Sequence, residues 1–216
     1  MECIVEMIGS KYQMIDNFLL MNYKLWEESL MALFYLVRHG QPDYSPCDER
    51  GYRGHGRDLA PLSEEGIRQA ELTAQDERLI GADIIVSSPY TRALQTAAII
   101  SKNTDINITV EVDLHEWMPD LTFQYKNFAE CLELTNDFNK YKGVYPEGEV
   151  KRWESLYMLR HRVRKVADKY SHYDKVILVC HGMVMRTLTY AEFIKPGEII
   201  ECKYEIGQPD CIYSFI

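Results

Sequence analysis

The sequence lacks an excess of positive charge, and it lacks cysteines at the spacings of metal fingers or disulfide frameworks. Its 216 residues include 24 lysines and arginines against 33 acidic residues, a net charge of -9, which argues against nucleic acid or an anionic membrane as a bulk partner. The six cysteines are scattered and form no C-x-x-C motif, as is typical of free thiols in a reducing cytosol. We therefore expect a cytoplasmic protein in which any anion site is local.

Long hydrophobic runs are also missing. Nothing in residues 1–30 could span a bilayer, and acidic residues there do not fit the cationic start of a secretory signal. Apolar residues nevertheless recur at spacings of three and four between Ile4 and Tyr23, as they do in an amphipathic helix. Two interpretations of residues 1–30 stay open: an accessory N-terminal helix, or upstream sequence that precedes a true start at Met31.

No Gly/Ser linker or internal repeat divides residues 31–216, so we expect them to form one domain. Apolar runs predict strands at 33–37, 82–86, 108–112 and 175–180, and helical patterns lie between them at 64–78, 89–101, 151–170 and 183–193. This order predicts an α/β fold, a three-layer sandwich whose mostly parallel central sheet is flanked by helices. Residues 116–149 look like an insertion with its own helix, and 199–215 look like a terminal hairpin.

Two of the predicted strands end in His-Gly. His39 follows the first strand and Arg38 directly, and His181 follows the strand that ends at Cys180. In open α/β sheets, ligands bind outside the carboxyl ends of the strands. We therefore expect both histidines at one crevice, together with Arg92, which lies near the start of the helix predicted after "SSP". Ser88 is the expected cap of that helix.

These residue types suit the chemistry of a phosphoryl group. An arginine grips two phosphate oxygens at once with its planar fork. A neutral imidazole is a competent nucleophile toward phosphorus, and a second, protonated imidazole can stabilise the oxygens of the transition state. The residues alone leave open which histidine attacks.

Four motifs resemble, in order and spacing, those of the histidine phosphatase superfamily, in its phosphoglycerate mutase-like branch. They are LVRHGQ (36–41), SSPYTRALQTA (87–97), LHEW (114–117) and VCHGMVMRTL (179–188). The resemblance extends over residues 32–215. Members of this family fold as α/β sandwiches and need no metal or cofactor.

The resemblance also implies a role for each matching residue. His39 corresponds to the nucleophile that becomes phosphohistidine, and His181 to the second histidine, which stabilises the phosphoryl group during transfer. Arg38 and Arg92 correspond to phosphate-binding residues. Glu116 stands where the family has its proton donor. His55, His161 and His172 match no motif and are interpreted as structural.

Substrate contacts are harder to predict. Arg53 and Arg57 lie in a loop rich in Gly, Pro and charge, where they could meet a second anionic group. Mutases of the family have a Glu-Ser pair after Arg-His-Gly and then an asparagine, whereas this chain has Gln41, Pro42 and Ser45 at the corresponding places. Gln41 and Ser45 are therefore candidate substrate contacts that differ from those of a mutase.

The sequence thus favours a phosphatase that hydrolyses a phosphomonoester through phosphohistidine. Its substrate would be a small phosphorylated metabolite or a phosphopeptide. Two alternatives stay open: a phosphoglycerate mutase-type transfer, and a non-catalytic module that binds phosphorylated partners. A silent module would normally have lost a catalytic residue, and all five family positions are occupied here.

If residues 31–216 form the whole catalytic domain, a chain that starts at Met31 should keep its catalytic constants and its melting temperature. A helix packed on the domain predicts the opposite, because each large apolar side chain contributes about 1.5–3 kcal/mol when fully buried. Thermal unfolding of the two chains distinguishes these outcomes. A large drop in Tm, or insolubility of the shorter chain, would contradict a dispensable extension.

Overall fold

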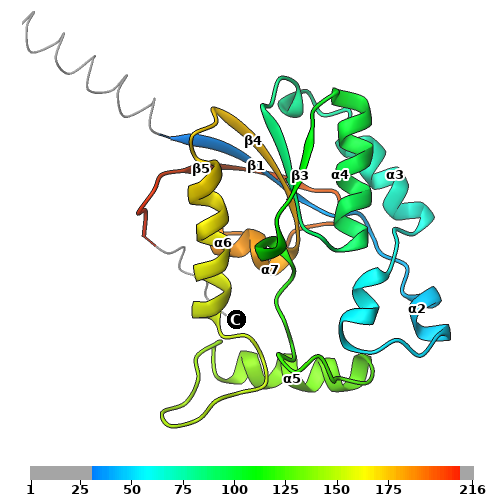
Figure 1. The fold of residues 1–216 in the computed structure, drawn as a ribbon, viewed down its shortest axis with the longest axis vertical. Coiled ribbons are helices and arrows are strands. Elements are labelled where there is room, and N and C mark those ends of the chain that lie inside the picture. The colour runs from blue at the N-terminus through cyan, green and yellow to red at the C-terminus, as the bar shows by residue number, and fades with distance from the viewer. Residues whose placement is uncertain (1–30, 210–216) are drawn as a thin grey trace, which may run out of the picture.

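The computed structural model describes residues 31–209 (Figure 1). Within them, strands form one sheet in the order β3-β2-β4-β1-β5. The strands are β1 (Ala32–Arg38), β2 (Ile84–Ser87), β3 (Ile108–Val110), β4 (Lys175–Cys180) and β5 (Ile199–Tyr204). All pair in parallel except β5, which is antiparallel to β1. The helix considered for residues 1–30 and the last strand of the predicted hairpin lie outside the described residues.

Helices cover both faces of the sheet (Figure 1). On one face lie α3 (Glu64–Thr73) and α4 (Thr91–Thr104), and on the other lie α6 (Leu156–Tyr170) and α7 (Gly182–Leu188). The connections carry α2 (Ser45–Glu49), α5 (Phe128–Lys140) and the 3-10 turns η1 (Gly54–Leu59), η2 (Glu77–Leu79) and η3 (Val112–Leu114). The predicted three-layer α/β fold with a mostly parallel sheet is confirmed.

Strand β1 is buried on both faces, because its alternate side chains enter two different cores. Phe34 and Leu36 pack with residues of α6 and α7, whereas Tyr35 and Val37 pack with residues of α4. Because helices cover both faces, the residues of this strand up to Val37 have to be apolar, as is typical of strands in parallel sheets.

The carboxyl ends of β1, β2 and β4 lie at the same level. The backbone N–H of His39 donates to the carbonyl of Cys180 at 3.0 Å, and that of Ser88 donates to the carbonyl of Val179 at 2.9 Å. His181 is the next residue after β4. The residues that follow these three strands consequently emerge side by side at one edge of the sheet.

The turn after β1 passes very close to the start of α3. A Cβ on Gly40 would lie 2.3 Å from the carbonyl oxygen of Gly66, so only glycine fits there. Helix α3 begins where the sequence predicts, with Ser63 Oγ accepting from the N–H of Gly66 at 3.0 Å. This close packing fixes the chain directly after the predicted nucleophile.

Two helices begin later than the sequence predicts. Helix α4 starts at Thr91, and Ser88 is not its cap. Helix α6 starts at Leu156, because the residues before it pair with a distant loop: the N–H of Glu154 donates to the carbonyl of Met118 at 2.9 Å. Helical periodicity carries no information about such long-range bonds.

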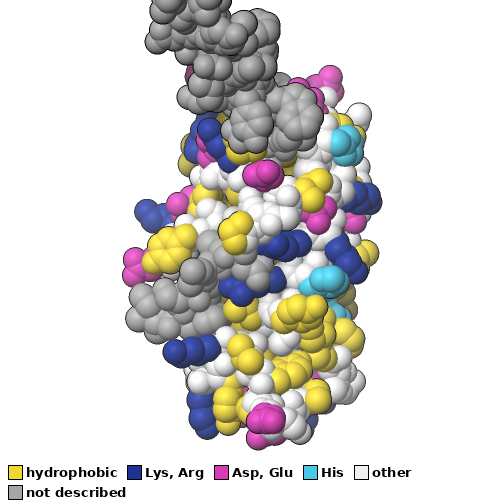
Figure 2. All heavy atoms as spheres, turned by 90° about the vertical axis from the view of Figure 1, so that its left-hand side faces the viewer, with side chains coloured by type: hydrophobic (Ala, Val, Ile, Leu, Met, Phe, Trp, Pro, Cys, Tyr) yellow, Lys and Arg dark blue, Asp and Glu magenta, His cyan; other side chains and the backbone are white. Residues whose placement is uncertain are grey.

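Figure 2 shows the face that lies on the left in Figure 1, with charged side chains of both signs and a group of hydrophobic side chains lower down. Val144, Val150 and Tyr157 are among the most exposed hydrophobic residues of the described chain. Such exposure is ordinary, because roughly half or more of a folded protein's accessible surface comes from apolar atoms. None of the described helices is long and apolar enough to cross a bilayer.

Candidate active site

His39, directly after β1, is almost fully buried. Its Nδ1 lies 2.7 Å from the carbonyl oxygen of Gly40, and since a carbonyl only accepts, Nδ1 carries the proton. Nε2 is then unprotonated, and it accepts a hydrogen bond from Nε of Arg92 at 3.3 Å. Burial, together with the charge of Arg92, lowers the pKa of His39 to about 3. The imidazole is therefore neutral at physiological pH.

His181 lies beside it, with the two ring centroids 4.9 Å apart. Its side chain is fully buried, and Nε2 lies 2.8 Å from the hydroxyl of Ser88. Burial lowers its pKa well below the ordinary value, and the electrostatic interactions with His39 and Arg92 act in the same direction. Ser88 therefore orients the second histidine from the end of the neighbouring strand β2.

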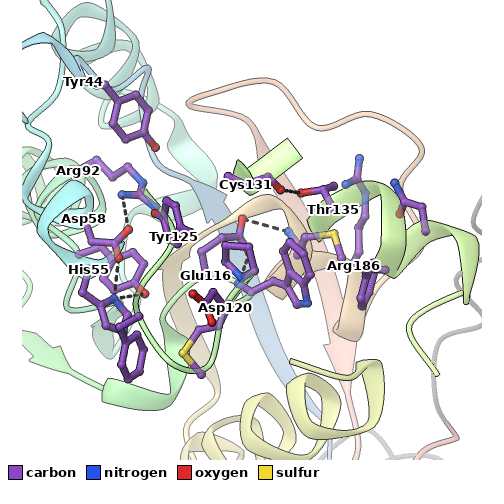
Figure 3. Close-up of a pocket in the computed structure, with 18 residues that line it drawn as sticks. Tyr44, His55, Asp58, Arg92, Glu116, Asp120, Tyr125, Cys131, Thr135 and Arg186 are labelled. Atoms are coloured by element: carbon purple, nitrogen blue, oxygen red, sulfur yellow. Dashed lines mark hydrogen bonds and ion pairs between the residues drawn. The ribbon is translucent and has the colours of Figure 1, made fainter. Parts of the chain in front are cut away.

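The guanidinium of Arg92 is paired on two sides. One nitrogen donates to His39, and Nη1 lies 3.3 Å from Asp58 Oδ1. Asp58 also accepts from Nδ1 of His55 at 2.7 Å. In Figure 3, Asp58 lies between Arg92 and His55. A carboxylate thus contacts the arginine that the sequence predicts to bind phosphate.

Arg38 completes the group that we call the basic cluster, which consists of Arg38, His39, Arg92 and His181. Arg38 donates from Nη1 to the carbonyl of Ile194. Among the described residues, Arg38 Nε and His181 Nδ1 are buried without a hydrogen-bond partner. Buried polar atoms in native proteins are normally paired, so unpaired ones in one cluster indicate a polar ligand.

Glu116 lies in the loop after η3 and faces the same crevice. Its Oε1 accepts from the backbone N–H of Trp117 at 2.8 Å, and Oε2 accepts from that of Met183 at 3.4 Å. Burial raises the pKa of Glu116 above its ordinary value, although the N–H groups of Trp117 and Met183 and the charge of Arg92 act in the opposite direction. The side chain therefore holds a proton at higher pH than an ordinary glutamate does.

The loop that carries Glu116 is held by a buried ion pair. Arg162, from α6, binds both carboxylate oxygens of Glu154 at 2.6 and 2.9 Å. The same guanidinium donates to the carbonyls of His115, at 2.8 Å, and of Glu116, at 3.2 Å. Glu154 in turn accepts from the Trp117 indole through its backbone carbonyl at 2.7 Å. The backbone on both sides of Glu116 is consequently fixed.

A cavity of about 420 Å³ opens in front of Glu116 and is lined by Arg92 at one end. In Figure 3, Glu116 lies between the Arg92 group and the α5 side chains Cys131 and Thr135. Aromatic and other apolar side chains make up much of the remaining lining. Of the basic cluster, Arg92 lines this cavity, whereas Arg38, His39 and His181 lie behind it and are not part of its lining.

The structure brings Arg38, His39, Arg92, Glu116 and His181 together, as the resemblance implies. The four predicted substrate contacts do not line the cavity. Gln41, Ser45 and Arg53 are exposed, and Arg57 forms an ion pair with Asp48. Their role in binding substrate stays a prediction.

Several residues at the site have no signal in the sequence. Ser88, Asp58 and Arg162 act through partners that are remote in the chain, and His55, interpreted as structural, lines the cavity. The run "WES" before α6 offers no pattern that would place Glu154 under the Glu116 loop. Among the described residues, no group of three or more His, Cys, Asp or Glu side chains is arranged to hold a metal ion.

Comparison with known proteins assigns the family. A model of the histidine phosphatase superfamily (branch 1) matches residues 34–201. A Hydrogenobacter thermophilus protein with the provisional name phosphoserine phosphatase 2 is 33% identical over 163 residues, which cover 73% of this chain and 77% of that protein. A Yersinia pestis protein with the provisional name phosphoglycerate mutase GpmB is 30% identical over 165 residues, 73% of each chain.

The fold agrees with this assignment. Bacillus stearothermophilus YhfR superimposes with a TM-score of 0.60 at 20% identity, covering 81% of this chain and 95% of that one. The chain belongs to the histidine phosphatase superfamily, and it is an enzyme of that family. Phosphatase-named and mutase-named relatives both occur, so membership supports phosphoryl-transfer chemistry without deciding between the two.

The ion pair below Glu116 generates a prediction. Arg162→Lys removes the fork that reaches the backbone carbonyls of Asp113, His115 and Glu116, so Glu116 should lose its fixed position. We expect kcat for an alkyl phosphate to fall by roughly tenfold or more, because misplaced acid groups lose much of their effect. Inhibition by inorganic phosphate should be unchanged, since the basic cluster is intact.

Steady-state kinetics on alkyl and aryl phosphates measures this effect. Lys165→Ala, at an exposed position of the same helix, serves as the control and should behave like the wild type. Equal losses on alkyl and aryl substrates, with weaker phosphate inhibition, would show that Arg162 supports the whole fold of the site rather than the position of Glu116.

Proposed function

We propose that this protein is a phosphatase that hydrolyses a phosphomonoester through a phosphohistidine at His39. The observation that carries the proposal is the hydrogen bonding of the His39 ring. Its Nδ1 proton is held by the carbonyl of Gly40, which leaves Nε2 as the basic nitrogen, next to the guanidinium of Arg92. A neutral imidazole with this tautomer can attack phosphorus without a separate base.

In the first step, Nε2 of His39 forms a bond to phosphorus as the bond to the leaving oxygen breaks. Arg38 and Arg92 neutralise the phosphoryl oxygens. The negative charge of the phosphoryl group favours protonation of His181, which then donates to an oxygen as charge develops. Glu116, whose pKa is raised by burial, gives its proton to the leaving oxygen.

In the second step, water attacks the phosphohistidine. Glu116 is now ionised and accepts a proton from that water while the bond between phosphorus and Nε2 breaks. Inorganic phosphate leaves, and both His39 and Glu116 return to their starting states. Each proton taken from the enzyme in the first step is thus restored in the second.

Water is the proposed acceptor because the residues that distinguish mutases are absent. A mutase has to retain its intermediate and return the phosphoryl group to it. Gln41 and Ser45 replace the mutase pattern after Arg-His-Gly, and both are exposed. The relative named phosphoglycerate mutase keeps the alternative of phosphoryl transfer open.

The substrate is proposed to be a small phosphorylated metabolite or a phosphopeptide, and the protein to act in the cytoplasm. A release assay for inorganic phosphate over a panel of such compounds tests this directly. Uniform absence of phosphate release, together with tight binding of phosphorylated ligands, would favour the non-catalytic module instead.

His39→Ala should abolish phosphate release while leaving the fold intact. The nucleophile is lost, but the alanine fits the space of the buried imidazole without a clash. Circular dichroism and thermal unfolding check the fold, and initial rates on the best substrate check the activity. His172→Ala, at a histidine outside the cavity, is the matched control and should retain full activity. Substantial turnover by the His39 variant would refute the mechanism.

Glu116→Gln should slow hydrolysis of an alkyl phosphate by roughly 10²- to 10⁴-fold, because an amide cannot protonate the leaving oxygen. An aryl phosphate should suffer less in the phosphorylation step, since its leaving group needs little protonation. In the wild type, alkyl phosphate hydrolysis should decline as the pH rises through the elevated pKa of Glu116.

The decline with pH should disappear in the glutamine variant. Pre-steady-state kinetics over a range of pH measures both effects on the phosphorylation step. If alkyl and aryl substrates lose the same factor in that step, Glu116 holds the substrate in position and is not the acid.

A further inference from the structure

The cavity contains a second region beside the basic cluster. Its walls are apolar or aromatic, and we call it the apolar arm: Tyr44, Trp117, Met118, Phe123, Tyr125 and Met183. Because Arg92 and Glu116 line the same cavity as these residues, a group attached to the leaving oxygen of a bound phosphomonoester would lie against the arm. In Figure 3, Tyr44 and Tyr125 of the arm lie on the Arg92 side of Glu116. The apolar character of the arm therefore affects which leaving groups the site accepts.

Phe123 is the most unusual residue of the arm. Its backbone has a φ of 58°, in the left-handed region, which a bulky residue rarely adopts. The residue is 43% exposed, although its ring packs against the ring of His55 with centroids 4.1 Å apart. A strained backbone that holds a partly exposed aromatic ring at a cavity indicates a functional constraint.

The surrounding structure enforces this conformation. Buried Asp120 accepts from the N–H groups of Thr122 and Gln124 at 3.0 and 2.9 Å, which closes the turn around Phe123. On the other side, a Cβ on Gly54 would lie 2.2 Å from the Phe123 carbonyl oxygen, so the glycine allows the turn to approach η1. The ring is thus placed by the insertion and by η1 together.

Charged groups along the arm are already engaged. Asp120 is bound by Arg152 at 2.6 Å, and Arg186 donates from Nε and Nη2 to the carbonyls of Ala191 and Glu192. Arg57, predicted to meet a second anion, instead pairs with Asp48 and lies outside the lining. The six side chains of the arm are uncharged and offer a carboxylate on the leaving group no ion-pair partner.

We infer that Phe123 is a stacking platform for the leaving group, and that the substrates are phosphomonoesters of aromatic or other bulky apolar alcohols. The inference rests on the proposed function, because it takes the basic cluster as the phosphate site. Stacking on Phe123 and removal of apolar surface from water would favour such substrates over small polar ones.

The test compares substrates that differ in the body of the leaving group but not in its reactivity. Benzyl phosphate, ethyl phosphate and phosphoserine all release a primary alcohol, so protonation by Glu116 is needed equally. We expect kcat/KM for benzyl phosphate to exceed that for ethyl phosphate and phosphoserine by about tenfold or more, which corresponds to about 1.4 kcal/mol.

Phe123→Asn removes the ring but keeps a residue that tolerates the left-handed backbone. This variant should bring the ratio of kcat/KM for benzyl phosphate to that for ethyl phosphate close to one, mainly by raising KM for benzyl phosphate. Phe123→Tyr should preserve the preference. Phe128→Ala, an exposed phenylalanine of the same insertion outside the cavity, is the control and should change nothing.

Binding of benzylphosphonate and ethylphosphonate, measured by calorimetry, separates this inference from the proposed function. If the protein releases no phosphate from any ester but still prefers benzylphosphonate, the proposed function fails and the platform stands. If neither kinetics nor binding distinguishes benzyl from ethyl compounds, or if folded Phe123→Asn keeps the full preference, the inference is wrong.

Discussion

The parallel pairing of β1 with β4, and of β4 with β2, is the constraint on which the site depends. Because these three strands end at one level, His181 emerges in contact with both His39 and Ser88. The two cores that clamp β1 from both faces make this register rigid. The glycine contact between Gly40 and Gly66 then fixes the turn beyond His39. A one-residue slip would invert every side chain of the strand and separate the two histidines.

Burial gives the basic cluster its chemical character. Taking His39 and His181 out of water, beside a permanent guanidinium charge, keeps both imidazoles neutral. The same exclusion of water raises the pKa of the Glu116 carboxyl, because burial disfavours the charged form of either group. Two neutral imidazoles and a carboxyl with a raised pKa therefore face one crevice. Under the proposed mechanism, the bound phosphate ester brings negative charge to these cationic surroundings. Arg92 then binds both Asp58 and the phosphate.

Features with a local cause could be predicted from the sequence. Apolar runs predict the strands, and His-Gly at two strand ends predicts that His39 and His181 lie at one edge of the sheet. The sequence also predicts Ser63 as the cap of α3. Residues that act across the fold could not be predicted. The local sequence favours Ser88 as a helix cap. Its actual contact is with His181 at the end of another strand, which no local pattern can reveal. Arg57 looked available for substrate because nothing in the sequence shows its pairing with Asp48, and Arg162 holds the Glu116 loop from a distant helix.

The central claim is that the phosphoryl group passes through Nε2 of His39, and rapid-quench labelling tests it most directly. Wild-type protein mixed with a phosphate-labelled substrate should show acid-labile, alkali-stable label within one turnover, and peptide mapping should place that label on His39. The label should form and decay at least as fast as phosphate is released. Turnover without label at His39, or label that persists far longer than a turnover, would contradict the account and favour direct attack by water.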